Sequence, residues 1–283
     1  MARSILITGC SSGIGYVCAL GLKQRGWRVF ATARNPDDVA RLSSEGLEAL
    51  QLDVTDSASI ETAVNEILQR TGGTLDALFN NAGYGQPGAV EDLPRQALHL
   101  QFDTNVFGPI ELTNRLLPIM RAQGHGRIIF NSSVLGYAAM RMRGAYNASK
   151  FALEGIADTL RLELYGTGIE VALIEPGPVE SKFRANCIPH YRRWINLDTS
   201  PHWPIYVAME ARLNHEGPAV PFTLPATAVL DKLIHALEAK RPRARYPVTV
   251  PAIVFAWAKR FLSTRMLDKL LMLATKSDNP KKM

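Results

Sequence analysis

The sequence predicts a single doubly wound α/β domain over residues 1–283, built on a mainly parallel sheet of about seven strands. Short β-branched runs alternate with helical stretches from residue 3 to about residue 174, which is typical of strands joined by crossover helices. Most of these runs are continuously apolar, as in strands buried on both faces. The chain is 47% hydrophobic, so it can bury a sizeable core, and no linker or repeat divides it.

The individual elements can be placed in order along the chain. Strands are expected at Ser4–Thr8, Arg28–Ala33, Leu47–Leu52, Ala77–Asn80, Arg127–Asn131, Glu170–Ile174 and Ala244–Val248. Helices are expected at Gly13–Arg25, Ser57–Arg70, Ala145–Tyr165 and Ala226–Lys240. The second of these helices begins after a candidate cap, Asp56. The stretch Pro94–Gln123 contains Gly108–Pro109 and is interpreted as two helices or one bent helix.

After Pro176 the alternation of strands and helices breaks down. Residues 183–225 hold six of the 17 prolines and several aromatics without a clean period, so we expect an irregular substrate lid there. Val254–Ala274 is interpreted as one amphipathic helix within a basic C-terminal helical extension over residues 252–283. Its apolar side chains are expected near one face: Phe255, Phe261, Leu262, Met266, Leu270 and Leu273.

The charge distribution argues against nucleic-acid binding. The formal net charge is +6, but residues 240–283 carry 11 Lys or Arg residues against two acidic ones, so the rest of the chain is net negative. Three cysteines without CxxC spacing indicate a reduced intracellular chain. The sequence has no recognisable export signal or spanning apolar run. We therefore expect a cytoplasmic protein, with peripheral contact at the inner membrane surface as its one membrane option.

A glycine-rich turn joins the first strand to the first helix. Glycines in such a turn let backbone N–H groups approach a pyrophosphate, and the helix N-terminus adds unpaired donors. The spacing is G-x-x-x-G-x-G, which departs from the common dinucleotide fingerprint. A merely structural turn is the alternative, which the strand-turn-helix context disfavours. The candidate phosphate-binding residues are Gly9, Ser11, Ser12, Gly13, Ile14 and Gly15.

The ends of the second and third strands bear on coenzyme choice. The second ends in Thr32-Ala33-Arg34-Asn35, without the carboxylate that binds the ribose hydroxyls of NAD. Arg34 can instead pair with a 2′-phosphate, so we predict NADP(H), with NAD(H) used more weakly. The alternative is a solvated surface arginine. At the end of the third strand, Asp53, followed by Val54, is a candidate contact for the adenine amino group or a helix cap.

Tyr146 and Lys150 are four residues apart near the start of a helix and share one face. An ammonium beside a phenol lowers its pKa and suits it to proton transfer. Ser133 follows the fifth strand, 13 residues before Tyr146. An ordinary exposed helix pair is the alternative, but it leaves the other matches in correct order unexplained.

Together these segments resemble the short-chain dehydrogenase/reductase family, whose members have a Rossmann-type fold. The resemblance covers residues 3–181 and rests on TGCSSGIG, on NNAG at Asn80–Gly83, on Asn105, Ser133, Tyr146 and Lys150, and on Pro176-Gly177. YNASKFALEG at Tyr146–Gly155 is similar to stretches of hydroxysteroid and retinol dehydrogenases and bacterial aldehyde reductases. RNPDDV and RYPVTV add a likeness to bacterial NADP-dependent aldehyde reductases.

The resemblance implies a role for each matching residue. Tyr146 would be the general acid in carbonyl reduction and the general base in alcohol oxidation. Lys150 would hold the nicotinamide ribose and lower the Tyr146 pKa, Ser133 would bind the substrate carbonyl, and Asn105 would hold a water. Asn81, Ala82 and Gly83 would pass along the cofactor. A turn with Ser181 where the family usually has Thr would grip the carboxamide, through Pro176, Gly177, Val179 and Ser181.

The predicted function is reversible carbonyl–alcohol interconversion on a small hydrophobic substrate. The alternatives are a non-catalytic NADP(H)-binding sensor or scaffold and, less favoured, a nucleotide-sugar epimerase or dehydratase. The six histidines have no ligand spacing, so no metal is expected. The resemblance implies a homodimer or homotetramer. For the C-terminal helix we favour a cover for the pocket or a subunit contact over a membrane contact.

Overall fold

The computed structural model describes residues 2–214, 217 and 220–275. Seven strands form one all-parallel sheet in the order β3-β2-β1-β4-β5-β6-β7. The strands are β1 (Ser4–Ile7), β2 (Arg28–Ala33), β3 (Glu48–Gln51), β4 (Ala77–Asn80), β5 (Gly126–Asn131), β6 (Ile169–Glu175) and β7 (Arg245–Pro247). The predicted doubly wound α/β class is confirmed, and every predicted strand is present with ends shifted by one residue at most.

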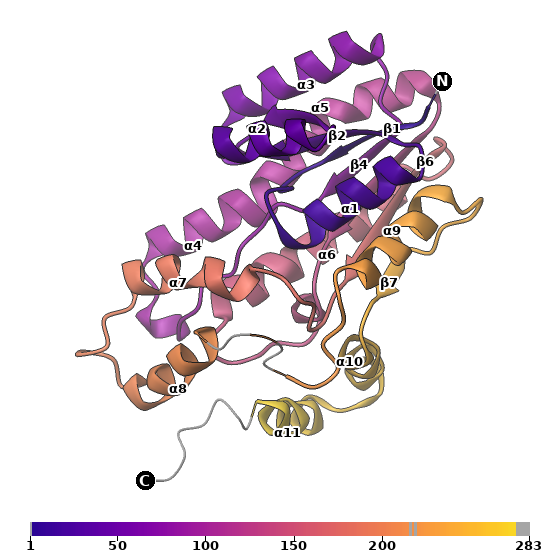
Figure 1. The fold of residues 1–283 in the computed structure, drawn as a ribbon. Coiled ribbons are helices and arrows are strands. Elements are labelled where there is room, and N and C mark those ends of the chain that lie inside the picture. The colour runs from indigo at the N-terminus through magenta and orange to yellow at the C-terminus, as the bar shows by residue number, and fades with distance from the viewer. Residues whose placement is uncertain (1, 215–216, 218–219, 276–283) are drawn as a thin grey trace.

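Helices cover both faces of the sheet (Figure 1). One face packs against α1 (Gly13–Gln24), α9 (Thr227–Glu238) and part of α2 (Pro36–Ser44). The other face packs against α3 (Ser57–Thr71), α5 (Gly108–Gln123) and α6 (Gly144–Glu163). Side chains from alternate positions of each strand enter the two separate apolar cores. This double burial explains why the strand sequences are continuously apolar.

Local capping explains several helix boundaries. The Asp56 side chain accepts a hydrogen bond from the Ala58 N–H and caps α3 as predicted, and the same helix ends at Gly72 in the left-handed region. The helix α2 was not among the predicted elements. Its signals were an Asn35 cap, which accepts from the Asp37 N–H, and Pro36 at the first helical position.

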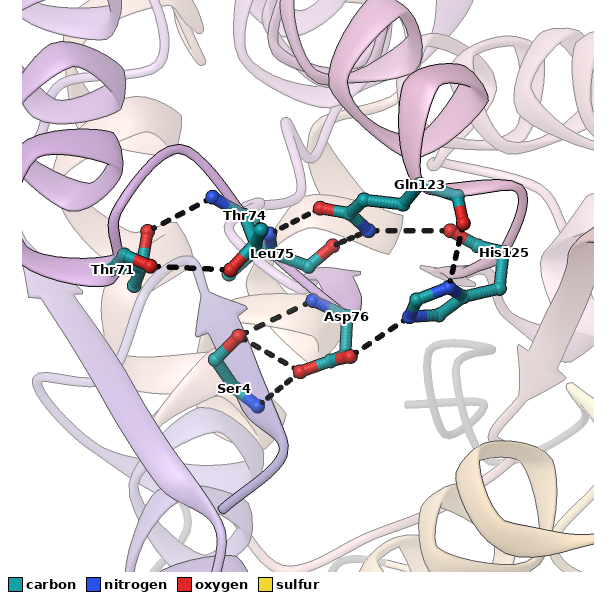
Figure 2. Close-up of polar contacts among 7 residues, drawn as sticks. All are labelled: Ser4, Thr71, Thr74, Leu75, Asp76, Gln123 and His125. Atoms are coloured by element: carbon teal, nitrogen blue, oxygen red, sulfur yellow. Dashed lines mark hydrogen bonds and ion pairs between the residues drawn. The ribbon is translucent and has the colours of Figure 1, made fainter. Parts of the chain in front are cut away.

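At the amino edge of the sheet, a polar network joins β1, β4 and β5 (Figure 2). One Asp76 carboxylate oxygen accepts from the Ser4 N–H at 2.7 Å and the Ser4 hydroxyl at 3.0 Å, and the other lies 3.0 Å from His125 Nε2. The Gln123 side chain accepts from the Leu75 N–H and donates to the Leu75 carbonyl. These contacts fix the starts of the strands at the edge where they begin.

The stretch Pro94–Gln123 folds as two helices with an insertion between them. The helix α4 (Arg95–Phe102) leads into a π-helical turn over Asp103–Phe107, and α5 follows without leaving the helical path. Pro109 lies in the first turn of α5, directly after the π-helical turn that interrupts the regular hydrogen-bond ladder, so its missing N–H is accommodated there. The π-helical turn contains the buried Asn105, and such turns are frequent at functional sites.

The prediction of an irregular stretch over residues 183–225 is wrong for much of its length. It contains the helices α7 (Phe183–Trp194) and α8 (Trp203–Leu213), while residues 215–216 and 218–219 lie outside the described part. Local sequence opposed these helices, because Pro189 lies inside α7. Tertiary packing favours them, since Tyr191 from α7 and Tyr206 and Met209 from α8 share a small core.

The prediction of one helix over Val254–Ala274 is also wrong. The segment forms α10 (Val250–Phe261) and α11 (Thr264–Ala274), separated by extended backbone at Leu262 and Ser263. The expected single apolar face does not form, because Leu267 and Leu271 turn inward while Phe261, Met266 and Leu273 are exposed. The end of the predicted extension, residues 276–283, lies outside the described residues.

The helices α4, α7, α8, α10 and α11 lie at the carboxyl end of the sheet (Figure 1). Ligands of open α/β sheets bind at this end. None of the described helices is long and apolar enough to cross a membrane.

Candidate active site

The glycine-rich turn follows β1 and contacts the segment that follows β4. Gly9 has φ +72°, and a side chain there would lie 2.8 Å from Ala82 Cα. A side chain at Gly15 would lie 2.3 Å from the Gly9 carbonyl oxygen. Only glycine therefore permits this close packing. Ser12, at the N-cap position of α1, makes no side-chain cap, and the first turn of α1 carries no acidic residue. The end of α1 is thus suited to an anion.

A hydrogen-bond network fixes Asn81 beside this turn. The Thr8 hydroxyl accepts from the backbone N–H groups of Asn81 and Ala82, at 3.0 and 2.9 Å. The Asn81 side-chain amide donates to the Thr8 and Gly9 carbonyls, and its oxygen accepts from Asn131 Nδ2 at 2.9 Å. The Asn131 carbonyl in turn accepts from Lys150 Nζ at 2.7 Å. One continuous network therefore connects the glycine-rich turn to Lys150.

Ser133, Tyr146 and Lys150 come together where β5 ends and α6 begins. Ser133 is buried, and its hydroxyl accepts from the Leu135 N–H while lying 3.5 Å from the Pro176 carbonyl. Tyr146 is half-buried, and Lys150 Nζ lies 5.7 Å from the centre of its ring. Ser133 lies two residues after the end of β5, and Tyr146 and Lys150 lie on α6, so regular elements on either side hold the three side chains in a fixed relation.

The electrostatics of the pair differ from the sequence-based expectation. Burial raises the pKa of the Tyr146 phenol above its ordinary value, and interaction with the Ser133 hydroxyl opposes the rise. Burial lowers the pKa of Lys150 to about 8, while Glu154 opposes that fall. The expected lowering of the Tyr146 pKa by Lys150 does not appear, because burial disfavours both the phenolate and the ammonium.

Asn105 lies in the π-helical turn and contacts Tyr84, the residue after Gly83. Its side-chain oxygen accepts from the Tyr84 N–H at 3.1 Å, and its amide donates to the Tyr84 carbonyl at 3.0 Å and to Ser149 Oγ at 3.1 Å. A side chain at Gly83 would lie 3.1 Å from the Asn105 oxygen. Asn105 thus joins the segment after β4 to the face of α6 that carries Tyr146.

Two arginines, Arg34 and Arg41, are candidates for binding a 2′-phosphate, and one of them contacts the glycine-rich turn. Arg34 directly follows β2 and is exposed. Sequence reasoning missed Arg41 on α2, whose guanidinium donates to the Ser11 carbonyl at 2.7 Å and lies over the Tyr16 ring. No sequence spacing identifies such a residue, since its place depends on how α2 packs. Asp53 accepts from the Thr55 N–H and hydroxyl and does not cap α3.

The turn after β6 meets the glycine-rich turn from the other side. A side chain at Gly13 would lie 3.1 Å from Ser181 Cβ. Val179 forms an isolated bridge with Leu224, which holds the turn in place. The turn therefore approaches the same region as α1, and its predicted members Pro176, Gly177, Val179 and Ser181 all belong to it.

The helix α7 packs across this edge. The Phe183 ring lies 5.4 Å from the Tyr146 ring, centre to centre, and the His190 ring stacks on Tyr84 at 3.9 Å. Burial lowers the pKa of His190, and it raises the pKa of Tyr84 to about 12. From α7, the side chain packed against Tyr146 is therefore an aromatic, apolar one, Phe183.

A buried ionic cluster beneath Lys150 was also missed. Glu154, one helical turn after Lys150, pairs with Arg245, which also contacts Glu175 at 2.7 Å and Asp158 at 2.6 Å. Burial raises the pKa of Glu175 to about 7, and nearby Glu154 adds to the rise. The i, i+4 spacing of Lys150 and Glu154 was the available signal. Among the described residues, no group of three His, Cys, Asp or Glu side chains is arranged to hold a metal.

These features define a dinucleotide-binding oxidoreductase of the doubly wound α/β class. The chain belongs to the short-chain dehydrogenase family, whose model matches residues 3–191. It is 42% identical over 271 residues to the uncharacterized oxidoreductase YbbO of Escherichia coli, with 96% of this chain and 94% of that one covered. The family expectation from the sequence is confirmed.

Two further comparisons extend the likeness over nearly the whole chain. An NADPH-dependent 3-dehydrocapnine reductase of Ornithobacterium rhinotracheale is 32% identical, with 95% of each chain covered. The crystal structure of a short-chain dehydrogenase from Streptomyces avermitilis is 28% identical and superposes with a TM-score of 0.76, covering 97% of each chain. Solved chains of similar fold include complexes with NAD and with NADPH.

Proposed function

We propose that this oxidoreductase interconverts a hydrophobic aldehyde or ketone and the corresponding alcohol, with NADP(H) preferred over NAD(H). One observation carries the proposal: Ser133, Tyr146 and Lys150 converge at the carboxyl end of β5, joined to the glycine-rich turn through Asn131 and Asn81. A sensor or scaffold needs the turn but has no use for this trio. A nucleotide-sugar epimerase or dehydratase is disfavoured by the length and the G-x-x-x-G-x-G spacing.

The residues present fit a nicotinamide dinucleotide. The close packing at Gly9 and Gly15, together with the acid-free first turn of α1, suits a pyrophosphate. Arg34, exposed directly after β2, and Arg41, whose guanidinium contacts the Ser11 carbonyl, would hold a 2′-phosphate. Asp53 and Val54 would border the adenine, Asn81, Ala82 and Gly83 the ribose, and Pro176, Gly177, Val179 and Ser181 the carboxamide. When bound, the nicotinamide supplies or accepts the hydride.

Tyr146 would transfer the proton at the substrate oxygen. The phenol is protonated at neutral pH in the free site, so it presents a proton donor to a carbonyl oxygen. Ser133 would hold the carbonyl oxygen by hydrogen bonding. Lys150, charged below about pH 8, would stabilise negative charge on the Tyr146 oxygen after the proton leaves. Asn105 would pass protons toward Lys150 by way of a bound water.

The apolar cover over Tyr146 supports a hydrophobic substrate. Phe183 contacts Tyr146 from α7, so we propose that residues 183–225 act as the substrate lid, with α7 and α8 as its helical parts. For the oligomer we propose a homodimer or homotetramer. A shallow groove between α5 and α6, lined by Ile110, Phe151 and Ile156 among others, is the surface that supports pairing.

The experiment is parallel oxidation of NADPH and NADH by the full-length protein with aliphatic and aromatic aldehydes, retinal and ketosteroids. We expect turnover with NADPH that exceeds turnover with NADH and that disappears in Tyr146→Phe. Tight NADPH binding without turnover on any carbonyl would favour the sensor. Binding of a nucleotide sugar would favour the epimerase or dehydratase, and full activity after chelation of metals is expected.

A further inference from the structure

We propose that the outer face of α10 and α11 is a docking surface for an anionic lipid bilayer. The helix α10 has two apolar faces: Ala252 and Phe255 are buried, while the opposite side is exposed at helical spacing. The exposed stripe, which we call the α10 stripe, consists of Val250, Ile253, Val254, Trp257 and Phe261. The buried face already anchors α10 to the protein. The exposed apolar face stays in water and does not stabilise the fold, so the stripe indicates a binding surface.

The aromatic end of the α10 stripe is well suited to a membrane interface. Trp257 is 60% exposed and Phe261 is 69% exposed, and their rings stack with centres 5.5 Å apart and an angle of 8° between planes. Trp favours the boundary between headgroups and acyl chains, where its apolar ring is buried and its N–H stays hydrated, and Phe adds apolar area that inserts beside it. The stripe therefore presents one preassembled aromatic pair to a partner.

The helix α11 also exposes apolar and basic side chains, on the side away from the core that it shares with α10. Leu267 and Leu271 are buried, whereas Met266 and Leu273 are 56% and 67% exposed. Residues 250–275 contain four basic residues and a single acidic one, Asp268. Lys259 lies over the Phe151 ring of α6, which leaves Arg260, Arg265 and Lys269 for the outer side. Basic residues that border exposed apolar side chains are the pattern of interfacial helices on anionic lipid.

Charge favours a bilayer over a second copy of the chain. A two-fold interface brings the same patch of each subunit together, so the basic residues of this segment would face their own copies. Like charges across an interface are repulsive, whereas an anionic leaflet attracts them. The groove between α5 and α6 carries the proposed subunit contact instead.

The docking surface and the candidate active site are two sides of one packed layer. Ala252, Phe255, Leu267 and Leu271 share a core with Val134, Leu135 and Ala138 from the loop after Ser133, and Tyr146 packs against that core. The Tyr137 hydroxyl also donates to the Ala252 carbonyl at 2.7 Å. Docking would hold the site close to the bilayer, where hydrophobic carbonyl compounds concentrate. This consequence, unlike docking itself, rests on the proposed function.

The test is co-sedimentation of the full-length protein with phosphatidylcholine vesicles, with and without phosphatidylglycerol. We expect binding that requires phosphatidylglycerol and weakens with salt, and about a tenfold loss of affinity in the double variant Trp257→Ser/Phe261→Ser. Arg265→Ala/Lys269→Ala should weaken binding to anionic vesicles. The matched control is Leu162→Ser/Tyr165→Ser, which changes two exposed apolar residues at the end of α6 and should leave binding unchanged.

Fluorescence locates the contact without any measurement of activity. Vesicles containing brominated lipid should quench Trp257, and Trp257→Phe should lose that quenching while it retains binding, because the apolar area remains. The proposal is overturned if wild-type protein does not bind anionic vesicles, or if Trp257→Ser/Phe261→Ser binds as wild type does. It is also overturned if that variant only converts an oligomer to a monomer, which would make the surface a subunit contact. An inactive protein that still docks would refute the proposed function alone.

Discussion

The region where the strands begin, the amino edge of the sheet, and the region where they end, the carboxyl edge, contain similar polar residues but have different roles. At the amino edge, Asp76 receives hydrogen bonds from Ser4 and pairs with His125, so its oxygens are all engaged (Figure 2). At the carboxyl edge, Tyr84 Oη, Asn131 Oδ1 and Asn147 Oδ1 are buried without a hydrogen-bond partner among the described residues. Each buried polar atom left unpaired costs about 1–3 kcal/mol. The amino edge therefore stabilises the sheet, while the carboxyl edge gives up stability for the sake of its chemistry.

The largest expected effect is at the carboxyl edge. Tyr146→Phe should lower kcat/KM for aldehyde reduction by about 10³-fold or more, because it removes the proton donor without removing the ring that packs on Phe183. NADPH should still raise the melting temperature of the variant, which thermal denaturation with and without NADPH measures. Retention of more than about a tenth of the wild-type activity would contradict the assignment of Tyr146 as the proton donor.

The opposite edge should show the reverse behaviour. Asp76→Ala should lower the free energy of unfolding by about 2 kcal/mol, since the Ser4 N–H and hydroxyl lose their acceptor. The activity of the folded fraction should stay as in wild type. Urea unfolding and initial rates measure the two quantities, and a selective loss of rate without loss of stability would contradict the division between the edges.

The same carboxylate gives the amino edge an acid dependence. Burial favours the neutral form of Asp76, but the Ser4 and His125 contacts outweigh it and lower its pKa below 3.8. A lowered carboxyl pKa contributes stability above the ordinary value and loses it as the pH falls through the folded value. Wild type and Asp76→Ala should therefore converge in stability below about pH 3.8. A constant difference down to pH 2, well below that value, would exclude the ionic contribution.

A smaller effect is expected at the margin of the carboxyl edge. Arg34→Ala should raise the KM for NADPH about 10- to 100-fold, as expected for one charge-assisted hydrogen bond, and leave the KM for NADH nearly unchanged. Arg41→Ala should act in the same direction, with some loss of stability because Arg41 also pairs with Asp38 and Glu45. Equal changes in the KM for NADPH and for NADH would mean that neither arginine binds the 2′-phosphate.

The sequence predicts the two edges unequally well. The strands β2 and β4 match their predicted ranges residue for residue, because continuous apolar runs between glycines and polar ends leave little freedom. The helices α7, α8, α10 and α11 were predicted poorly, since their ends depend on contacts between distant segments, such as Leu267 with Val134. Prolines and aromatics in this part of the chain obscure the helical period.

Some residues of the candidate site were predicted from the sequence and others were missed, for the same reason. Ser133, Tyr146 and Lys150 were found because their spacing places a strand end beside a helix start. The contact of Arg41 with Ser11 and that of Arg245 with Glu154 and Glu175 were missed, because each joins elements whose relative position appears only in the folded chain. The altered electrostatics of Tyr146 and Lys150 depend on burial, which spacing does not encode.

The smallest expected effect is a pH dependence set by that burial. Because the pKa of Lys150 is lowered to about 8, its ammonium is charged below that pH and neutral above it. If the charge supports proton transfer from Tyr146, log kcat/KM for reduction should fall above pH 8 by about one unit per pH unit. Lys150→Arg, whose guanidinium stays charged, should be slower overall but should lack this decline.

Stability should change in the opposite direction over the same range. The unfolded chain binds a proton at Lys150 up to its ordinary pKa of 10.5, whereas the folded chain releases it near pH 8. Unfolding therefore becomes less favourable as the pH rises between these values, and this contribution is lost as the pH falls again. Melting curves of wild type and Lys150→Met should diverge least at high pH. If both rate and stability fell together above pH 8, general alkaline unfolding rather than Lys150 would limit the carboxyl edge.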